Sequence, residues 1–224
     1  MANIVITGAN RGIGFELTKL YSEQGHSVTA ICRESNDELE ELADQVISGI
    51  DLTASKAIEA TASITEQLLM GEPLDILINN AGIFGNETLS DLDVERIRLQ
   101  FEINALIPLQ LTHALLPLMK NGSKVVNITS RMGSIADNSS GEYYGYRASK
   151  AALNAFAKSL AIDLKPQGIA IAQIHPGFVQ TRMVNFQGDL TPAQAAQGIA
   201  ARIDDLTLST SGGFWHSNGQ VLPW

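Results

Sequence analysis

The sequence contains a single cysteine, Cys32, and no apolar run long enough to cross a lipid bilayer. One cysteine excludes an internal disulfide and a thiolate metal cluster within the chain, so redox chemistry requires a bound cofactor. Charged residues make up only 17% of the chain, and acidic residues outnumber basic ones by 24 to 15, which gives a net charge of -9. This imbalance opposes nonspecific attraction to nucleic acid or anionic membranes, and we expect neither as a partner.

Metal-ligand spacing is also lacking among the histidines. His26, His113 and His216 are widely separated, so we expect structural or exposed roles for them and no metal site. His175 adjoins a Pro-Gly turn, and we expect it to pack that turn.

Export and linker signals are missing as well. No basic segment followed by an apolar run precedes the strand-like sequence at Asn3, so we expect no cleaved signal and a cytoplasmic protein. The 224 residues show no linker-like change of composition, and 45% of them are hydrophobic. The sequence therefore predicts one domain over residues 1–224.

Short apolar runs alternate with amphipathic stretches along the chain. The predicted strands are Asn3–Thr7, Ser27–Cys32, Asp75–Ile78, Lys124–Thr129 and Ile169–Ile174, with weaker candidates at Val46–Ile50 and Gln220–Leu222. The predicted helices are Gly12–Gln24, Asn36–Gln45, Ser55–Met70, Asp91–Lys120 and Tyr144–Lys165, with another beginning after Thr191-Pro192. This βαβ rhythm predicts an α/β fold, a Rossmann-type doubly wound parallel sheet with helices on both faces.

A glycine-rich turn, Thr7-Gly8-Ala9-Asn10-Arg11-Gly12-Ile13-Gly14, directly follows the first predicted strand. Without side chains in the way, backbone amides and the positive helix end can approach a pyrophosphate. The spacing differs from the G-x-G-x-x-G fingerprint, and simple strand-to-helix geometry is the alternative explanation.

The end of the second strand bears on the choice of cofactor. Arg33, together with Arg11 from the glycine turn, is suited to binding a 2′-phosphate, which favours NADP(H) over NAD(H). The alternative is that both arginines are solvated surface charges, with Glu34 weakening the positive field. Asp51 is suited either to an adenine amino group or to capping the next helix.

Two further motifs lie at the ends of predicted strands or on a helix. Asn79-Asn80-Ala81-Gly82 follows a strand that a doubly wound sheet places beside the first, where small residues admit a cofactor. Tyr146 and Lys150 lie four residues apart and share one helical face, so the ammonium is expected to lower the pKa of the phenol. Such a tyrosine would exchange protons near neutral pH, which indicates a nucleotide-dependent oxidoreductase.

Together these motifs, with Ser130, Tyr146-Arg147-Ala148-Ser149-Lys150 and Pro176-Gly177, resemble the short-chain dehydrogenase/reductase family over nearly the whole chain. Within it, the glycine turn, Tyr146-Arg147, Pro176 to Thr181 and the closing Leu222-Pro223-Trp224 are similar to the sniffer/C-factor group of carbonyl reductases.

The resemblance implies a catalytic set of Asn104, Ser130, Tyr146 and Lys150. Tyr146 would donate a proton to the carbonyl oxygen, Ser130 would hydrogen-bond that oxygen, Lys150 would bind nicotinamide ribose hydroxyls, and Asn104 would help position a water. It also implies cofactor contacts from Thr7, Gly8, Asn10, Arg11, Gly12, Ile13, Gly14, Arg33, Asp51, Leu52, Asn79, Asn80, Ala81, Gly82, Tyr146, Lys150, Pro176, Gly177, Val179 and Thr181.

Some assignments have local competitors. Thr129 and Ser134 flank Ser130, but only Ser130 has a glycine three residues on, and a loop insertion at Asp137–Gly141 lengthens the interval to Tyr146. Tyr143 and Tyr144 lack a lysine four residues later, so we expect them at the site mouth or in local packing. A buried hydrogen bond would equally explain Asn104.

The substrate side has little sequence for a lid, because few residues separate Gly177 from Pro192. We therefore expect an open pocket with an apolar wall from Phe178, Met183, Val184 and Phe186, suited to a hydrophobic or aromatic aldehyde, ketone or quinone, or the matching alcohol. Core packing is the alternative for these side chains.

The predicted function is NADPH-dependent reduction of a small-molecule carbonyl. An NADP(H)-binding signalling or regulatory protein is the alternative, and a scaffold would not require the catalytic set. The Ala-rich helix Ala148–Ala161 suggests a homodimer or homotetramer, although packing within one subunit explains it equally.

Overall fold

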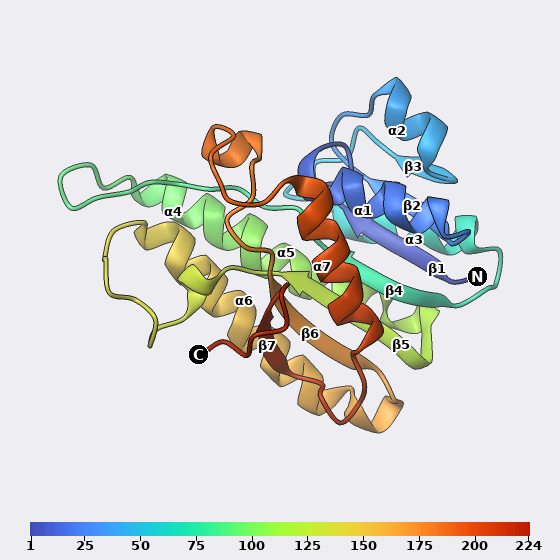
Figure 1. The fold of residues 1–224 in the computed structure, drawn as a ribbon. Coiled ribbons are helices and arrows are strands. Elements are labelled where there is room, and N and C mark those ends of the chain that lie inside the picture. The colour runs from blue at the N-terminus through green and yellow to red at the C-terminus, as the bar shows by residue number, and fades with distance from the viewer.

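Seven parallel strands form one sheet in the computed structural model, which describes residues 1–224 (Figure 1). The order is β3-β2-β1-β4-β5-β6-β7, so the direction of winding reverses between β1 and β4. The strands are β1 Asn3–Thr7, β2 Ser27–Ile31, β3 Gln45–Ile47, β4 Leu74–Asn79, β5 Met119–Ile128, β6 Ala170–His175 and β7 Gly213–His216. The predicted doubly wound sheet is confirmed, and its switch point is the expected place for a ligand crevice.

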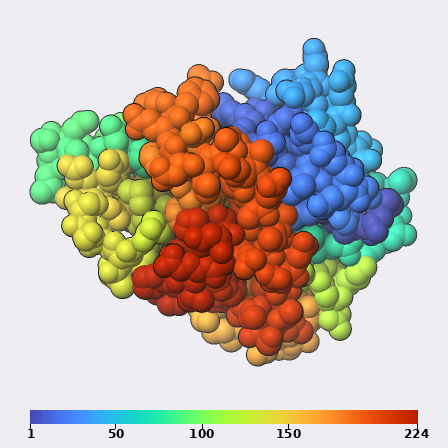
Figure 2. All heavy atoms as spheres, in the orientation of Figure 1, coloured from blue at the N-terminus to red at the C-terminus, as the bar shows by residue number.

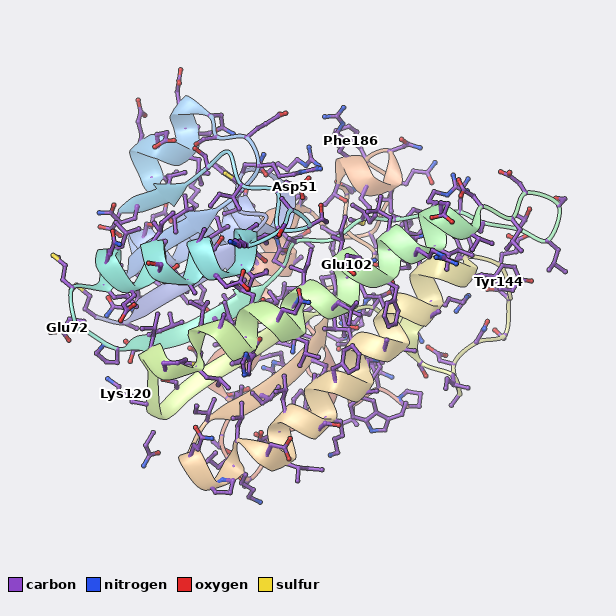
Figure 3. The ribbon with its side chains drawn as sticks, turned by 180° about the vertical axis from the view of Figure 1, so that it is seen from behind. Asp51, Glu72, Glu102, Lys120, Tyr144 and Phe186 are labelled. Atoms are coloured by element: carbon purple, nitrogen blue, oxygen red, sulfur yellow. The ribbon has the colours of Figure 1, made fainter.

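Two helical layers cover the sheet. On one face α1 (Gly12–Glu23) and α7 (Pro192–Asp204) bury Leu17 and Ile199 against the strands, and α2 (Asp37–Leu42) lies near β3. The opposite face, turned to the viewer in Figure 3, carries α3 (Ala57–Leu69), α5 (Ile107–Leu115) and α6 (Tyr144–Asp163), which bury Leu69, Leu111 and Ala157. Burial on both faces explains the near-continuous apolar character of the strands.

The long helix predicted at Asp91–Lys120 is not continuous. It is divided into α4 (Val94–Phe101), a π-helical turn (Glu102–Leu106), α5 and a 3₁₀ turn (Leu116–Leu118), and β5 already begins at Met119. Pro108 lies in the first turn of α5 and Pro117 in the 3₁₀ turn. A proline has no N–H to donate, so each marks a place where regular α-helical bonding stops.

Other elements also differ from the predictions. The helix predicted at Asn36–Gln45 ends at Leu42, because Gln45 already pairs with Thr29 as the first residue of β3. The predicted strand Gln220–Leu222 is absent, since Val221 makes only an isolated antiparallel bridge to Trp215 of β7. The last strand instead begins directly at Gly213 and pairs with β6.

The start of α7 agrees with the sequence. The Thr191 hydroxyl caps the helix by accepting a hydrogen bond from the Gln194 N–H, and the Gln194 side-chain oxygen accepts one from the Thr191 N–H, with Pro192 in the first turn. None of the helices combines the length and apolar character needed to span a membrane.

Candidate active site

A cleft of about 770 Å³ opens at the carboxyl ends of the strands. It begins at the glycine turn between β1 and α1, passes Asn80–Gly82 after β4, and ends at Tyr146 and Lys150 on α6. In Figure 2 the orange segment near residue 180 lies next to the blue N-terminal segment. Figure 3 places Asp51 and Phe186 at this same edge of the molecule.

The glycine turn is packed tightly against the segment after β4. A Cβ on Gly8 would lie 2.9 Å from the Cα of Ala81, and Gly8 has a φ of +65°, which side-chain-bearing residues rarely adopt. The Thr7 hydroxyl accepts hydrogen bonds from the N–H groups of Asn80 and Ala81, both at 3.0 Å. The Asn80 side chain donates back to the carbonyls of Thr7 and Gly8. These contacts fix the end of β1 to the segment after β4, and together they form the base of the cleft.

Not every predicted cofactor residue lines the cleft. Asn79 is buried and donates to the Thr112 hydroxyl and to the Asn127 side chain, so it ties β4 to α5 and β5. Val179 forms a bridge with Leu190. The predicted cofactor residues outside the lining are Thr7, Gly14, Asn79, Gly177 and Val179, and those in it are Gly8, Asn10, Arg11, Gly12, Ile13, Arg33, Asp51, Leu52, Asn80, Ala81, Gly82, Tyr146, Lys150, Pro176 and Thr181.

Arg11 and Arg33 stand together at the end of the cleft beside β2. Asn10 donates a 2.9 Å hydrogen bond to the carbonyl of Glu34, and Asn36 donates to the carbonyl of Asn10, so the two loops that carry the arginines are joined. Both guanidinium groups are exposed and face the cleft. This arrangement suits an anionic group placed between them.

Asp51 lies in the same part of the cleft. Its carboxylate accepts hydrogen bonds from the N–H and the hydroxyl of Thr53, which lower its pKa, and the positive charge of Arg33 contributes as well. The residue that precedes α3 is Lys56, so the interpretation of Asp51 as the cap of that helix is wrong. The local turn to Thr53 leaves its other oxygen free to accept from a ligand.

Tyr146 and Lys150 form the other end of the cleft, on one face of α6 as predicted. Both are buried, and the Lys150 Nζ donates a 2.9 Å hydrogen bond to the carbonyl of Ile128 at the end of β5. The Nζ lies 5.9 Å from the centre of the Tyr146 ring. Ser130 follows β5 and lies close enough to the phenol to hydrogen-bond it, so three members of the predicted catalytic set converge.

The pKa of Tyr146 is not lowered as the sequence predicts. Burial raises it to about 12, and the hydrogen bond with Ser130 offsets only part of that rise. Burial also lowers the pKa of Lys150 to about 8. The four-residue spacing predicted that Tyr146 and Lys150 share one helical face. It did not predict that both side chains are buried, and burial disfavours the charged form of each, phenolate and ammonium alike. The phenol is therefore neutral at pH 7, as a proton donor must be.

Asn104 lies in the π-helical turn between α4 and α5. Its amide donates to the carbonyl of Ile83 (2.9 Å) and to the Ser149 hydroxyl (3.0 Å), and its oxygen accepts from the Ile83 N–H (2.8 Å). Both amide donors are thus used within the protein, which matches the buried hydrogen-bonding explanation. Through Ser149 this side chain reaches α6 between Tyr146 and Lys150.

The competitors of Ser130 are engaged elsewhere. The Thr129 hydroxyl donates to the Asn154 side chain at 2.8 Å, and the Ser134 hydroxyl accepts from the Asp137 N–H. Asp137 also pairs with Arg131 at 2.8 Å, so the inserted loop is anchored without displacing Ser130.

The apolar wall differs in part from the prediction. Met183 and Phe186 line the cleft, whereas Phe178 and Val184 do not. Sequence reasoning missed Phe84, whose ring centre lies 4.9 Å from that of Tyr146 in an edge-to-face arrangement. Its signal was its position just beyond Gly82, where a large apolar residue follows a cofactor-lining segment. Ile103 and Arg182 also line the cleft and were missed.

Two kinds of comparison place this chain among known proteins. Residues 2–190 match the family described as short chain dehydrogenase. A Rhodococcus sp. protein named 1-hydroxy-2-glutathionyl-2-methyl-3-butene dehydrogenase is 37% identical over all of both chains. The C-signal protein of Myxococcus xanthus is 43% identical over 68% of this chain and 93% of its own.

Solved structures agree with the sequence matches. The carbonyl reductase Sniffer of D. melanogaster superposes with a TM-score of 0.92 at 31% identity, covering 100% of both chains. The NADPH-bound carbonyl reductase from chicken fatty liver gives a TM-score of 0.91 at 28% identity, covering 100% of this chain and 99% of the other.

The fold, the cleft and these matches show that the chain belongs to the short-chain dehydrogenase/reductase family, whose members are NAD(P)-dependent oxidoreductases. Within that family it resembles the sniffer/C-factor group, as the sequence predicted.

Proposed function

We propose that the chain is an NADPH-dependent reductase that converts the carbonyl group of an aldehyde, ketone or quinone to an alcohol. The observation that carries this proposal is a single cleft lined by Tyr146 and Lys150 at one end and by Arg11 and Arg33 at the other, with Ser130 beside the Tyr146 phenol. The similarity to the Sniffer and chicken carbonyl reductases supports the same reaction class.

The residues of the cleft fit NADP(H). Its lining includes four cationic side chains and two carboxylates, an excess of positive charge in a chain whose net charge is -9. The cationic residues are Arg11, Arg33, Lys150 and Arg182, and the acidic ones are Glu34 and Asp51. Local positive charge favours a ligand with several phosphates, and the paired arginines favour a 2′-phosphate over a bare ribose. When bound, the dinucleotide supplies the hydride.

The protein's own groups supply the proton and the orientation. Tyr146 is neutral at pH 7 and donates its proton to the carbonyl oxygen, while the Ser130 hydroxyl orients that oxygen by hydrogen bonding. Lys150 directs its ammonium toward ribose hydroxyls and the developing phenolate. Its pKa near 8 lets it pass on a proton at neutral pH. Asn104 fixes α6 through Ser149.

The wall of the substrate half favours an apolar carbonyl compound. Phe84, which contacts Tyr146, lines the cleft together with Ile103, Met183 and Phe186, and these side chains would desolvate an aromatic or hydrophobic substrate. The Rhodococcus relative is named as a dehydrogenase of a hydroxy compound, so oxidation of an alcohol by the same residues is the reverse reaction to be measured beside reduction.

The test is to mix the purified protein with NADPH or NADH and a panel of aromatic aldehydes, ketones and quinones, following nicotinamide absorbance. We expect NADPH oxidation that falls by roughly 10²–10⁴-fold in a folded Tyr146→Phe variant, the range expected for a lost proton donor. Wild-type turnover in that variant would refute the mechanism, and faster turnover with NADH would refute the cofactor assignment.

A regulatory role is the second candidate, because the chain is similar to the Myxococcus xanthus C-signal. In that case cofactor occupancy would alter a partner-binding surface, and Tyr146→Phe would abolish turnover while leaving biological activity intact. The expected cytoplasmic location and the homodimer or homotetramer both stay predictions.

A further inference from the structure

An ion pair with a fully buried carboxylate and a partly exposed arginine lies beside the substrate half of the cleft and has no part in the chemistry described above. Glu87, in the loop between β4 and α4, is fully buried. Its Oε1 accepts a 2.7 Å hydrogen bond from Arg96 Nε and another of 2.7 Å from Gln100 Nε2. Both donors are on α4, one turn apart, so the carboxylate fixes the loop to one face of that helix.

The backbone at two glycines lies directly against the side-chain cluster of Glu87, Arg96 and Gln100. A Cβ added to Gly85 would meet the Glu87 carboxylate and the Gln100 amide, and a Cβ added to Gly145 would meet the same amide and lie 3.0 Å from the Cα of Ile97. Gly145 belongs to α6. The loop, α4 and the first turn of α6 therefore meet at this one side-chain cluster, at the end of the molecule where the label Tyr144 stands in Figure 3.

Glu87 also fixes the start of α6 through its backbone carbonyl. The Tyr143 N–H donates a 2.8 Å hydrogen bond to the carbonyl of Glu87. Glu142 and Tyr143 are consecutive non-glycine residues with a φ of 55°, a left-handed conformation that residues with side chains rarely adopt and that persists only where the surroundings impose it. The catalytic helix thus starts from a strained pair of residues held partly by Glu87.

Aromatic contacts carry this restraint to the catalytic tyrosine. The ring of Tyr143 lies 5.5 Å from that of Phe84, and Phe84 lies 4.9 Å from Tyr146. Phe84 and Glu87 share one loop, whereas Tyr143 and Tyr146 share the start of α6. A shift between these two segments would move Phe84 relative to the phenol.

Stability alone is a poor explanation for the cluster. Glu87 Oε2, Arg96 Nη2 and Gln100 Oε1 are buried without a protein partner, and a buried ion pair with unsatisfied atoms is often no more stable than an apolar replacement. Burial raises the pKa of Glu87, but the hydrogen bonds to its carboxylate and the charge of Arg96 together outweigh burial, so the pKa lies below its ordinary value and the carboxylate is charged at pH 7.

We propose that Glu87 is a positioning residue for the substrate half of the cleft, holding the loop after β4 against α4 and the start of α6 so that Phe84 stays against Tyr146. The proposal rests on the carbonyl reductase activity proposed above for its kinetic consequences. Its structural consequence, restraint of the residues around Tyr143, is independent of that activity.

The test compares Glu87→Gln, Arg96→Met and the double variant, with Arg98→Met as a matched control. Arg98 is on the same helix and pairs with Glu95 at 3.7 Å, but both side chains are largely exposed. We expect Arg96→Met to lower kcat/KM for the carbonyl substrate at least tenfold, because it leaves a charge buried without its partner. The double variant should recover much of this loss, while the control and the Kd for NADPH change less than twofold.

Amide hydrogen exchange supplies a readout that does not depend on turnover. Exchange in residues 142–147 should quicken at least tenfold in Arg96→Met and return toward wild type in the double variant. Unchanged exchange there in folded Arg96→Met would overturn the proposal, even if the wild-type protein reduced no carbonyl compound. A parallel loss of NADPH affinity would also overturn it, because that pattern indicates general loosening. If Arg96→Met does not fold, Gln100→Met removes the other donor and is judged by the same criteria.

Discussion

The ammonium of Lys150 lies 5.9 Å from the ring centre of Tyr146 and donates a hydrogen bond to the carbonyl of Ile128. Both side chains are buried, and burial moves their pKa values in opposite directions, to about 8 for the lysine and about 12 for the tyrosine. The pair is thus held in a state that disfavours charge on both members until a ligand enters.

Lys150→Met is therefore expected to stabilise the protein while abolishing efficient turnover. A fall in pKa from 10.5 to about 8 corresponds to about 3 kcal/mol of destabilisation at pH 7, of which the lost hydrogen bond to Ile128 offsets roughly 1–2 kcal/mol. Because the folded pKa is the lower one, the penalty is complete below pH 8 and disappears as pH rises toward 10.5.

Urea denaturation of both proteins at several pH values measures this effect. The advantage of the variant should be largest at pH 7 and shrink between pH 8 and 10.5. A variant that is less stable than wild type at pH 7 would contradict the assigned burial cost.

Arg33→Met tests the phosphate end of the cleft. Charge-assisted hydrogen bonds contribute about 1.5–3 kcal/mol, so NADPH affinity should fall roughly tenfold to a hundredfold. NADH affinity should change little, because NADH has no 2′-phosphate. Titration by nicotinamide fluorescence gives both values, and exposed Arg98→Met is the control. Equal losses for the two cofactors would show that Arg33 does not distinguish them.

Gly133→Ala tests the contact between the serine turn and α6. A Cβ at this position would lie 2.7 Å from the backbone carbon of Lys150, so the turn carrying Ser130 and the helix must move apart. We expect a loss of about 1–3 kcal/mol in stability and a lower kcat with little change in NADPH Kd.

Gly25→Ala is the control for that substitution. It has a φ of +77° but open space around it, so it should lower stability through backbone strain and leave kcat intact. If both variants reduced kcat equally, the serine turn would have no special part in the loss.

His175→Gln addresses stability in acid. Burial, together with the charges of His216 and Arg131, lowers the pKa of His175 from 6.5 to about 3. Below pH 6.5 the unfolded chain therefore binds a proton at His175 that the folded protein does not bind. The contribution of His175 to stability is fully present above pH 6.5 and is lost as pH falls toward 3. The loss reaches roughly 3 kcal/mol at pH 4.

The glutamine variant should lose less stability than wild type between pH 7 and pH 4, as measured by thermal or urea unfolding. His113, which is exposed, gives the matched control His113→Gln. Identical pH dependence in all three proteins would mean that His175 is protonated in the folded state.

Periodicity predicted the sheet and its two helical layers, and the four-residue spacing predicted that Tyr146 and Lys150 share one helical face. The placement of Ser130 beside them was implied by the family resemblance. The sequence did not predict the π-helical turn between α4 and α5, where Asn104 bonds to Ile83 and Ser149, because periodicity does not report contacts between distant segments. The pKa of Tyr146 was missed for the same reason: burial is a property of the assembled fold.

The cofactor residues show a similar division. Glycines and small residues in the turn were found from sequence, but Asn79 proved to tie strands together and not to line the cleft. Phe84 was missed because its loop has no periodic pattern, although its position just beyond Gly82 was a signal, and its ring contact with Tyr146 shows its place.

The strand order also bears on how the chain is made. After β4 joins β1, the strands β5, β6 and β7 add to the sheet in chain order, each outside the one before. A chain emerging from the ribosome can therefore extend its sheet without displacing a finished strand. The segment between β6 and α7, which brings Thr181, Met183 and Phe186 to the cleft, emerges late. We expect the nascent protein to hold a folded nucleotide half well before it can enclose a substrate.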